Sequence, residues 1–277
     1  MTELPKISLV TPSYNQAQFL ETTLRSVLDQ HYPKLEYFVM DGGSADDSPE
    51  IIRRYAHQFA GWVSAPDAGQ AAAINAGFAR STGEIMAWLN SDDLLMPGAL
   101  SLVGQIFARY PQITWLSGWD ANVDVDGHIT AVRLPVGRFS ALIRRGWYHG
   151  RGLGFIRQES TFWRRALWER SGGQLDEKRR YTMDFALWQR FAAHADLVTV
   201  DSLLAAFRHQ PQQKTAEIER YYAEIGVRLP SAARLLTLPL RAALAGPTWP
   251  LTPHVRYDRH THAWQFRPGP LFRPGIR

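Results

Sequence analysis

The sequence contains no cysteine, which excludes disulfide bonds and thiolate zinc sites and permits a reducing compartment. It also lacks any uncharged apolar stretch of about 18 residues, so no membrane-spanning helix is expected. The opening run, "MTELPKISLV", enters a strand-like pattern within six residues and leaves no room for a signal peptide. These absences predict a cytoplasmic protein.

Acidic residues are scarce at one end of the chain. Residues 226–277 contain eight arginines and one acid, Asp258, whereas residues 1–225 contain 23 basic and 25 acidic residues. We therefore expect a near-neutral domain over residues 1–225 and a basic C-terminal extension over residues 226–277. The extension includes tryptophans and a helix-like stretch at 231–245. This composition suits peripheral contact with an anionic membrane at its inner face, although packing against the body is an equal alternative.

The first half of the chain alternates strand-like and helix-like segments. Short β-rich runs occur at 7–11, 36–40, 62–65 and 85–89, and longer helix-like segments at 17–30, 49–59 and 70–80. Such alternation predicts an α/β fold with a mainly parallel central sheet and helices on both faces. Further along, the pattern predicts helices at 97–109 and 182–194, strands at 197–200 and 203–208, and a hairpin around "DVDGH".

Each of the four strand-like runs ends in a polar cluster, namely "TPSYN", "DGGSADDS", "PDAGQ" and "NSDD". Ligands of parallel sheets bind outside the carboxyl ends of the strands, so these clusters predict one binding site. A nicotinamide-dependent oxidoreductase is excluded, because "TPSYNQ" lacks the glycines of a dinucleotide-binding loop. A nucleic-acid partner is not expected either, since the acidic edge would repel phosphates unless metal is present.

The "NSDD" cluster places Asp92 and Asp93 directly after an apolar run. Two adjacent carboxylates beside a buried strand repel each other, so their position calls for an explanation. One explanation is a polar turn in which Asp93 caps a helix that starts near Pro97.

Four stretches, "ISLVTPSYNQAQFLETTLRSVLDQ", "VMDGGSADDS", "NSDD" and "MDFALWQR", resemble the signature segments of the family 2 glycosyltransferases. The resemblance covers roughly residues 5–210, in the right order and spacing. It implies the GT-A nucleotide-diphospho-sugar transferase fold and inverting, nucleotide-sugar-dependent chemistry. Residues 226–277 resemble nothing that we can place.

The resemblance implies a metal site for the donor diphosphate. Asp93 would bind Mg²⁺ or Mn²⁺ directly, since both ions prefer carboxylate oxygens, and Asp92 would face the ribose or a metal-bound water. His209 would be a further ligand of the metal or the diphosphate, as in some enzymes of this fold.

It also implies a nucleotide pocket at the ends of the first three strands. Asp41 resembles the residue that recognises the base, and Pro12, Ser13 and Tyr14 lie where the family holds base and ribose. Asp67 would lie near the same pocket. The alternatives are a strand-end turn for Asp41 and helix capping for Asp67.

Asp184 resembles the catalytic base, which takes the proton from the acceptor hydroxyl. The family often has Glu-Asp at this point, whereas this chain has Met183-Asp184. Gln158 and Glu159 fall near the sugar and acceptor pocket. Trp188 is either a platform for the sugar or a core residue.

The function that the resemblance implies is inverting transfer of a hexose from a nucleotide-diphosphate sugar, with uridine expected as the base. The acceptor would be a glycan or a lipid-linked molecule, and the process would be cell-surface polysaccharide synthesis. The alternative is a non-catalytic glycan- or nucleotide-binding protein on the same fold.

Overall fold

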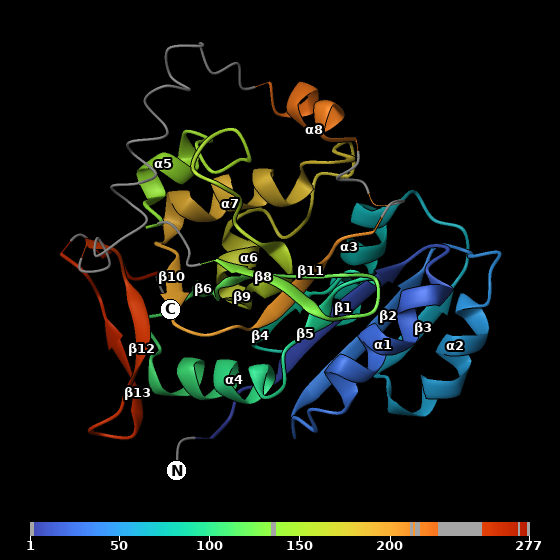
Figure 1. Cartoon of the computed structure of the whole chain (residues 1–277), viewed down its shortest axis with the longest axis horizontal. Coiled ribbons are helices and arrows are strands. Elements are labelled where there is room, and N and C mark those ends of the chain that lie inside the picture. The colour runs from blue at the N-terminus through green and yellow to red at the C-terminus, as the bar shows by residue number, and fades with distance from the viewer. Residues whose placement is uncertain are drawn as a thin grey trace.

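The computed structural model describes residues 3–133, 137–210, 213, 217–226, 251–270 and 272–275; the helix expected at 231–245 lies outside these ranges. A nine-stranded sheet with the order β13-β12-β10-β6-β9-β4-β1-β2-β3 runs through the molecule between layers of helices (Figure 1). Parallel pairs predominate, and β9 and β13 run against their neighbours. The α/β fold class and the mainly parallel sheet are confirmed.

The first half of the chain alternates as its pattern predicts. Its elements are β1 (Ile7–Ser13), α1 (Ala17–Leu28), β2 (Leu35–Asp41), α2 (Ser48–Tyr55), β3 (Gly61–Ser64), α3 (Gln70–Arg80) and β4 (Ile85–Trp88). The segment expected to be helical to residue 59 leaves the α-helix at Tyr55 and continues as a 3₁₀ turn, Ala56–Gln58.

The second half mixes shorter strands with helices. Its elements are β5 (Leu94–Leu95), α4 (Ala99–Arg109), β6 (Trp115–Ser117), β7 (Asp120–Val123), β8 (Ile129–Arg133), α5 (Ser140–Arg144), a 3₁₀ turn (Gln158–Ser160), β9 (Thr161–Arg164), α6 (Arg165–Arg170), α7 (Met183–His194), β10 (Val198–Val200), β11 (Ala205–Arg208), α8 (Ile218–Ile225), β12 (His254–Asp258) and β13 (Ala263–Arg267). The expected hairpin around "DVDGH" is confirmed as the β7–β8 pair.

The sheet separates two apolar cores because alternate residues of each strand point to opposite faces. In β1, Ile7 and Leu9 pack with α1, α2 and α4 on one face. Val10 packs with α3, α5, α6 and α7 on the other. Both cores hold the strand ends rigidly, which fixes the loops that follow them.

The second core contains a cluster of five tryptophans that contact one another. Ring centroids lie 5.5 Å apart for Trp88 and Trp163, and 6.0 Å apart for Trp88 and Trp188. Trp115 and Trp168 complete the cluster at centroid distances of 5.7 and 6.2 Å from its members. All five side chains are buried. Because Trp88 is the last residue of β4, the cluster packs against the end of that strand.

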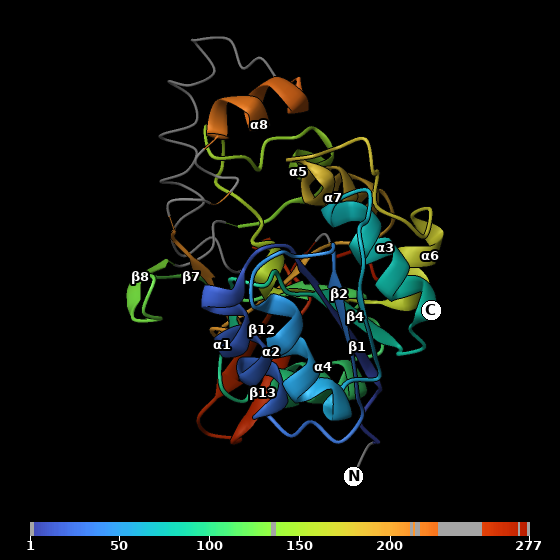
Figure 2. The ribbon, with the colours of Figure 1, turned by 90° about the vertical axis from the view of Figure 1, so that its right-hand side faces the viewer.

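A second, four-stranded sheet has the order β5-β11-β7-β8 and lies at the end of β4. In Figure 2 its β7–β8 hairpin projects from the edge of the molecule. The chain's C-terminal hairpin joins the large sheet, because β12 pairs with β10. The described part of the basic extension therefore packs against the body, while the division of the chain into two domains stays a prediction.

In the described part of the chain, no helix is both long and apolar enough to span a bilayer.

Candidate active site

The side chain of Asp41 is fixed at the carboxyl end of β2. Strand register places it beside Ser13 of β1 and Ser64 of β3. Its carboxylate accepts hydrogen bonds from the Ser44 amide (3.0 Å), the Ser44 hydroxyl and the Ser64 hydroxyl (2.7 Å). The carboxylate is 2% exposed, so these donors hold it in one orientation facing the strand ends.

The loops after β1 and β2 are tied to each other. The Asn15 amide donates to the Ser44 hydroxyl (2.8 Å), and the Asn15 side-chain oxygen accepts from the Ala45 amide (2.9 Å). Between these ties, Pro12 and Ser13 end β1 and Tyr14 projects with 63% of its surface exposed. The structure thus brings together the residues predicted for the base and ribose.

Asp67 lies against the same pair of loops. A Cβ atom at Gly42 would lie only 3.1 Å from its carboxylate, so the loop after Asp41 passes close to Asp67. Asp67 accepts the amide of Gly69 (2.7 Å), and α3 begins one residue later without a side-chain cap bond. Asp67 therefore lies beside the loop that follows Asp41, and its carboxylate orders the turn before α3.

Asp93 is completely buried after β4. Its carboxylate accepts the backbone amide of Arg208 (3.0 Å) and the side-chain amide of Asn90 (3.1 Å). Burial, followed by the charges of Asp92 and Glu159, raises the pKa of Asp93 well above its usual range. The alternative role as a helix cap is wrong, because α4 starts at Ala99 behind a left-handed Gly98 and has no side-chain cap bond.

Asn90 is the hub of the polar network around Asp93. Its side-chain nitrogen donates to Asp93 and to the Gln158 side-chain oxygen, each at 3.1 Å. Its oxygen accepts the Gln70 side-chain amide at 2.7 Å. Gln158 in turn donates to the Trp88 carbonyl (2.5 Å), so one network joins β4, α3 and the turn before β9.

Asp92 is half-buried, and its carboxylate accepts the side-chain amide of Gln210 (3.1 Å). Arg208 donates from its side chain to the Asp92 carbonyl (2.7 Å) and to the carbonyls of Asp124 (2.9 Å) and Val125 (2.7 Å). Arg208 is thereby engaged with backbone oxygens and holds the β7–β8 turn against the Asp92–Asp93 segment.

These carboxylates fit a divalent cation in their chemistry. Two adjacent aspartates, one of them fully buried with a raised pKa, carry repulsion that a cation would relieve. His209 is exposed, and burial followed by Arg157 and Arg133 lowers its pKa, which favours the neutral form that binds metals.

One group of three possible ligands with atoms within 4.8 Å of one another occurs among the described residues, and it is Asp124, Asp126 and His128 in the β7–β8 turn. The sequence predicts only the turn of a hairpin at this segment. Asp124 there accepts the amides of Asp126 (3.0 Å) and His128 (2.9 Å), so hydrogen bonds of the turn account for the cluster. The predicted ligands Asp92, Asp93 and His209 do not form such a group by themselves.

Two further acidic residues, Glu159 and Asp184, form the part of the site that the sequence predicts to bind the acceptor, here called the acceptor side. Glu159 is 4% exposed, and burial raises its pKa to about 7, with Arg157 opposing and Asp120 and Asp184 adding to the rise. Asp184 lies in the first turn of α7 and accepts the amide of Phe185 (2.7 Å). The carboxylates of Asp93, Glu159 and Asp184 therefore form a series, each within electrostatic range of the next.

Trp188 lies in the core rather than in this series. It is 3% exposed and stacks on Trp88 with the ring planes 8° apart. Its burial agrees with the core alternative for this residue. The sequence assigns no role to Asn90 and Gln210, which contact Asp93 and Asp92, or to Arg157, whose charge lowers the pKa of Glu159. For Asn90, its place in "NSDD" is the available signal.

A family model described as "Glycosyl transferase family 2" matches residues 8–170, which is more than half of the chain. The chain belongs to this family. The match includes Asp41, Asp92, Asp93 and Glu159, whereas Asp184 lies beyond it. The predicted family is confirmed, and the protein is a glycosyltransferase.

The sequence resembles those of other proteins that are named glycosyltransferases and that of a synthase. It is 36% identical over 111 residues to a glycosyltransferase of Nostoc, covering 37% of this chain and a third (33%) of that relative's length. It is 28% identical over 204 residues to one of Mycobacterium tuberculosis, covering 72% of this chain and 71% of the relative. A chondroitin synthase of Pasteurella multocida is 30% identical over 130 residues, 46% of this chain and 14% of the synthase.

Solved structures share the fold of the glycosyltransferase. TarS of S. aureus, in complex with UDP-GlcNAc, superposes with a TM-score of 0.59 at 16% identity, over 83% of this chain and 69% of TarS. A mannosyltransferase of Pyrobaculum calidifontis, in complex with GDP-Man and Mn²⁺, gives 0.58 at 21% identity, over 88% of this chain and 74% of that one. The predicted GT-A fold is confirmed.

Proposed function

We propose that this glycosyltransferase moves a hexose from a UDP-sugar to a glycan or lipid-linked acceptor, with inversion, in the synthesis of a cell-surface polysaccharide. The observation that carries the proposal is the polar network at the end of β4, in which Asn90 donates to Asp93 and to Gln158, the neighbour of Glu159. The charge of Asp184 at the start of α7 contributes to the raised pKa of Glu159. The chondroitin synthase relative supports a polysaccharide product.

The donor nucleotide lies across the ends of β1 and β2 in this proposal. Asp41 accepts polar groups of the base, and Tyr14, exposed beside it, stacks on the base or ribose. Asp93 and Asp92 would hold Mg²⁺ or Mn²⁺, with His209 as a further ligand. The cation, when bound, offsets the charge of the diphosphate as it leaves.

Asp184 acts on the acceptor. Its carboxylate takes the proton of the acceptor hydroxyl while the oxygen forms a bond to the anomeric carbon. The bond from that carbon to the diphosphate breaks at the same time, and the electron pair leaves with the nucleotide diphosphate. Glu159 and Gln158 are buried. In this proposal they lie between Asp93 and Asp184 and line the pocket for the sugar that is transferred.

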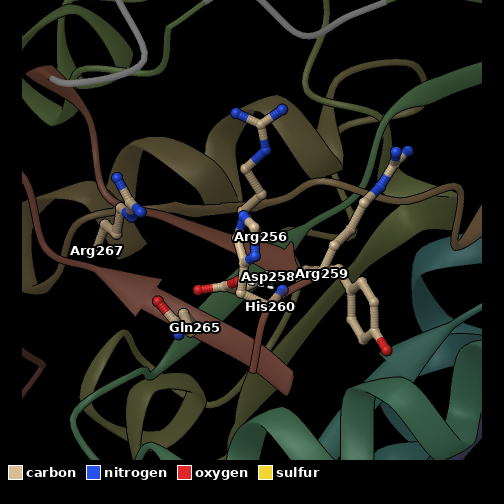
Figure 3. Close-up of a pocket in the computed structure, with 7 residues that line it drawn as sticks. Arg256, Asp258, Arg259, His260, Gln265 and Arg267 are labelled. Carbon is tan, nitrogen blue, oxygen red and sulfur yellow. Dashed lines mark hydrogen bonds between the residues drawn. The ribbon is translucent and has the colours of Figure 1, made fainter. Parts of the chain in front are cut away.

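Peripheral binding to an anionic membrane at its inner face belongs to the same proposal, because a lipid-linked acceptor lies there. Strand register puts Arg256, Gln265 and Arg267 on one face of the β12–β13 hairpin, and Val255 and Phe266 on the face toward the core. Arg256, Arg259 and Arg267 are among the residues that line a pocket of about 550 Å³. Figure 3 shows these three side chains on the β12–β13 hairpin.

The exposure of a neighbouring apolar side chain supports a membrane as the partner of this hairpin. Leu251, just before β12, exposes 49% of its surface. Arginines beside an exposed aliphatic side chain suit the boundary of an anionic bilayer, where each basic residue contributes about 1 kcal/mol.

Calorimetry with UDP, GDP, ADP and CDP, each with and without Mn²⁺, tests the donor part of the proposal. We expect one nucleotide, UDP, to bind with an affinity that falls at least tenfold in EDTA. Turnover of the corresponding nucleotide sugars then identifies the hexose. Binding of none of the four would overturn the proposed site.

A further inference from the structure

The helix α8 lies over the start of α7, at the far end of the molecule from the N-terminus (Figures 1 and 2). Its residues are half-buried or exposed. Its position therefore depends mainly on polar and ring contacts. These contacts go to the loop 146–155 and to residues 180–182, which directly precede α7.

Glu224 of α8 makes the contacts to residues 180–182. Its carboxylate accepts the backbone amides of Arg180 (3.1 Å), Tyr181 (3.3 Å) and Thr182 (3.1 Å). It also accepts the hydroxyl of Thr182 at 2.5 Å. Four donors from three consecutive residues thus converge on one side chain.

Thr182 is the N-cap residue of α7, and its side chain makes no cap bond to that helix. In a capping box, a glutamate three residues into the helix accepts the amide of the N-cap residue. This chain has Phe185 at that position. Glu224 supplies the missing carboxylate from another helix, and its negative charge suits the positive end of α7.

The other contacts of α8 reach Asp184 and the glycine-rich loop. Burial, followed by the charge of Asp184, raises the pKa of Tyr221, which places the phenol near that carboxylate. The Tyr221 ring also meets Phe155 edge-on at 5.7 Å. A Cβ atom at Gly150 would lie 2.7 Å from both Phe155 and the Tyr222 hydroxyl, so the loop needs glycine there.

We infer that Glu224 is a positioning residue for Asp184, and that α8 completes the acceptor side of the site. The inference rests on the proposed function, in which Asp184 accepts the proton. Glu224 fixes the backbone two residues before Asp184, and small displacements of a reacting group lower rates steeply. The contacts of α8 described above go to the loop 146–155 and residues 180–182 rather than to Asp41 or Asp93, so donor binding should be unaffected.

The first test compares Glu224→Ala and Glu224→Gln with Glu169→Ala. Glu169 is exposed on α6 and makes none of the contacts of α8 described above, so its removal is the control for loss of one negative charge. We expect kcat to fall about tenfold in Glu224→Ala, and less in Glu224→Gln because its amide oxygen still accepts the bonds of one carboxylate oxygen. Donor KM, the Kd for UDP and the kcat of Glu169→Ala should stay at wild-type values.

The second test combines Glu224→Ala with Asp184→Asn. If Glu224 acts through Asp184, the double variant loses no more turnover than Asp184→Asn alone. Additive losses, or a rise in donor KM that accounts for the effect, would overturn the inference.

The two proposals can fail separately. Wild-type turnover in Asp184→Asn would refute the role of Asp184 as base. Loss of turnover in Asp184→Asn, with wild-type kcat in both Glu224 variants, would refute only the positioning role.

Discussion

The backbone amide of Arg208 donates a 3.0 Å hydrogen bond to the carboxylate of Asp93, from which it is separated by 115 residues in the chain. The bond joins β11 of the small sheet to the segment after β4 of the large one. Asp93 is therefore held from both sheets, and its full burial makes the charged carboxylate costly to stability. Removing this charge should therefore impair function and preserve or increase stability.

Asp93→Asn tests this opposition. The asparagine retains the size of the side chain and removes the buried charge, so the variant should unfold at an equal or higher temperature at pH 8. It should also lose Mn²⁺-dependent binding of UDP, measured by calorimetry. Asp29→Asn, at an exposed pair with Arg25, is the control and should change neither property. Undiminished UDP affinity of the wild type in EDTA would contradict the metal role.

Asp184→Asn should leave the Kd for UDP unchanged and lower turnover by about 100-fold or more, the usual scale for loss of a general base. Asp176→Asn, in the loop before α7 and paired with Arg179, is the matched control. Turnover is measured as release of nucleotide diphosphate in the presence of acceptor. A near wild-type rate would leave Asp184 a structural residue.

The pKa of Glu159 makes stability depend on pH. Because burial raises this pKa from 4.5 to about 7, the folded protein binds the proton more tightly than the unfolded chain. The stability that this group contributes is present below pH 4.5 and is lost as pH rises through about 7. Without metal, the unfolding temperature should therefore fall between pH 6 and pH 8.

Glu159→Gln should reduce that fall and unfold several degrees higher than the wild type at pH 8, since each kcal/mol corresponds to about 2–4 °C in a chain of this size. Thermal melts at the two pH values measure the effect. Glu169→Gln, on the exposed side of α6, should behave as the wild type. An unchanged slope in Glu159→Gln would show that other groups cause the pH dependence.

Replacing Arg256, Arg259 and Arg267 with serine should weaken binding to anionic vesicles about 100-fold at low salt, from about 1 kcal/mol for each arginine. Vesicle sedimentation measures this partition. Transfer to a soluble acceptor should be unchanged, because the hairpin lies at the edge of the sheet opposite β3.

The control for this triple variant changes Arg53, Arg109 and Arg170 to serine. These arginines are exposed on α2, α4 and α6 and carry the same total charge. Equal sedimentation of the two triple variants would mean that the hairpin has no special role at the membrane.

Trp188→Ala should destabilise the protein by about 3–5 kcal/mol, the usual cost of truncating a buried aromatic residue. Trp62→Ala, with 37% of the side chain exposed, should cost clearly less. Urea unfolding compares the two variants. A Trp188 variant of wild-type stability and raised donor KM would instead support the sugar-platform alternative.

Local patterns predict the first half of the fold well, because each strand–helix unit there has its own apolar periodicity. The helix Gln70–Arg80, for example, has the bounds that the sequence predicts. Parallel strands then bring the polar ends of β1 to β4 together, so Asp41, Asp67 and Asp93 could be assigned to one edge.

The contacts that complete the site could not be predicted in this way. The side chain of Gln210 reaches Asp92 across 118 residues, and Glu224 reaches Thr182 from a helix with no buried residue. Neither contact leaves a periodic signal. Trp188 is a similar case, since α7 carries apolar residues on most of its surface and the sequence does not tell its core face from its site face.

The five clustered tryptophans also give the protein optical properties. Trp88 and Trp188 lie nearly parallel at 6.0 Å, a separation at which their electronic transitions couple and excitation passes between rings. The carbonyl of Trp88 accepts a hydrogen bond from the side chain of Gln158. That side chain in turn accepts a hydrogen bond from Asn90, which also donates to Asp93. Intrinsic fluorescence and near-ultraviolet circular dichroism should therefore respond to events at Asp93, which gives binding experiments a signal that needs no label.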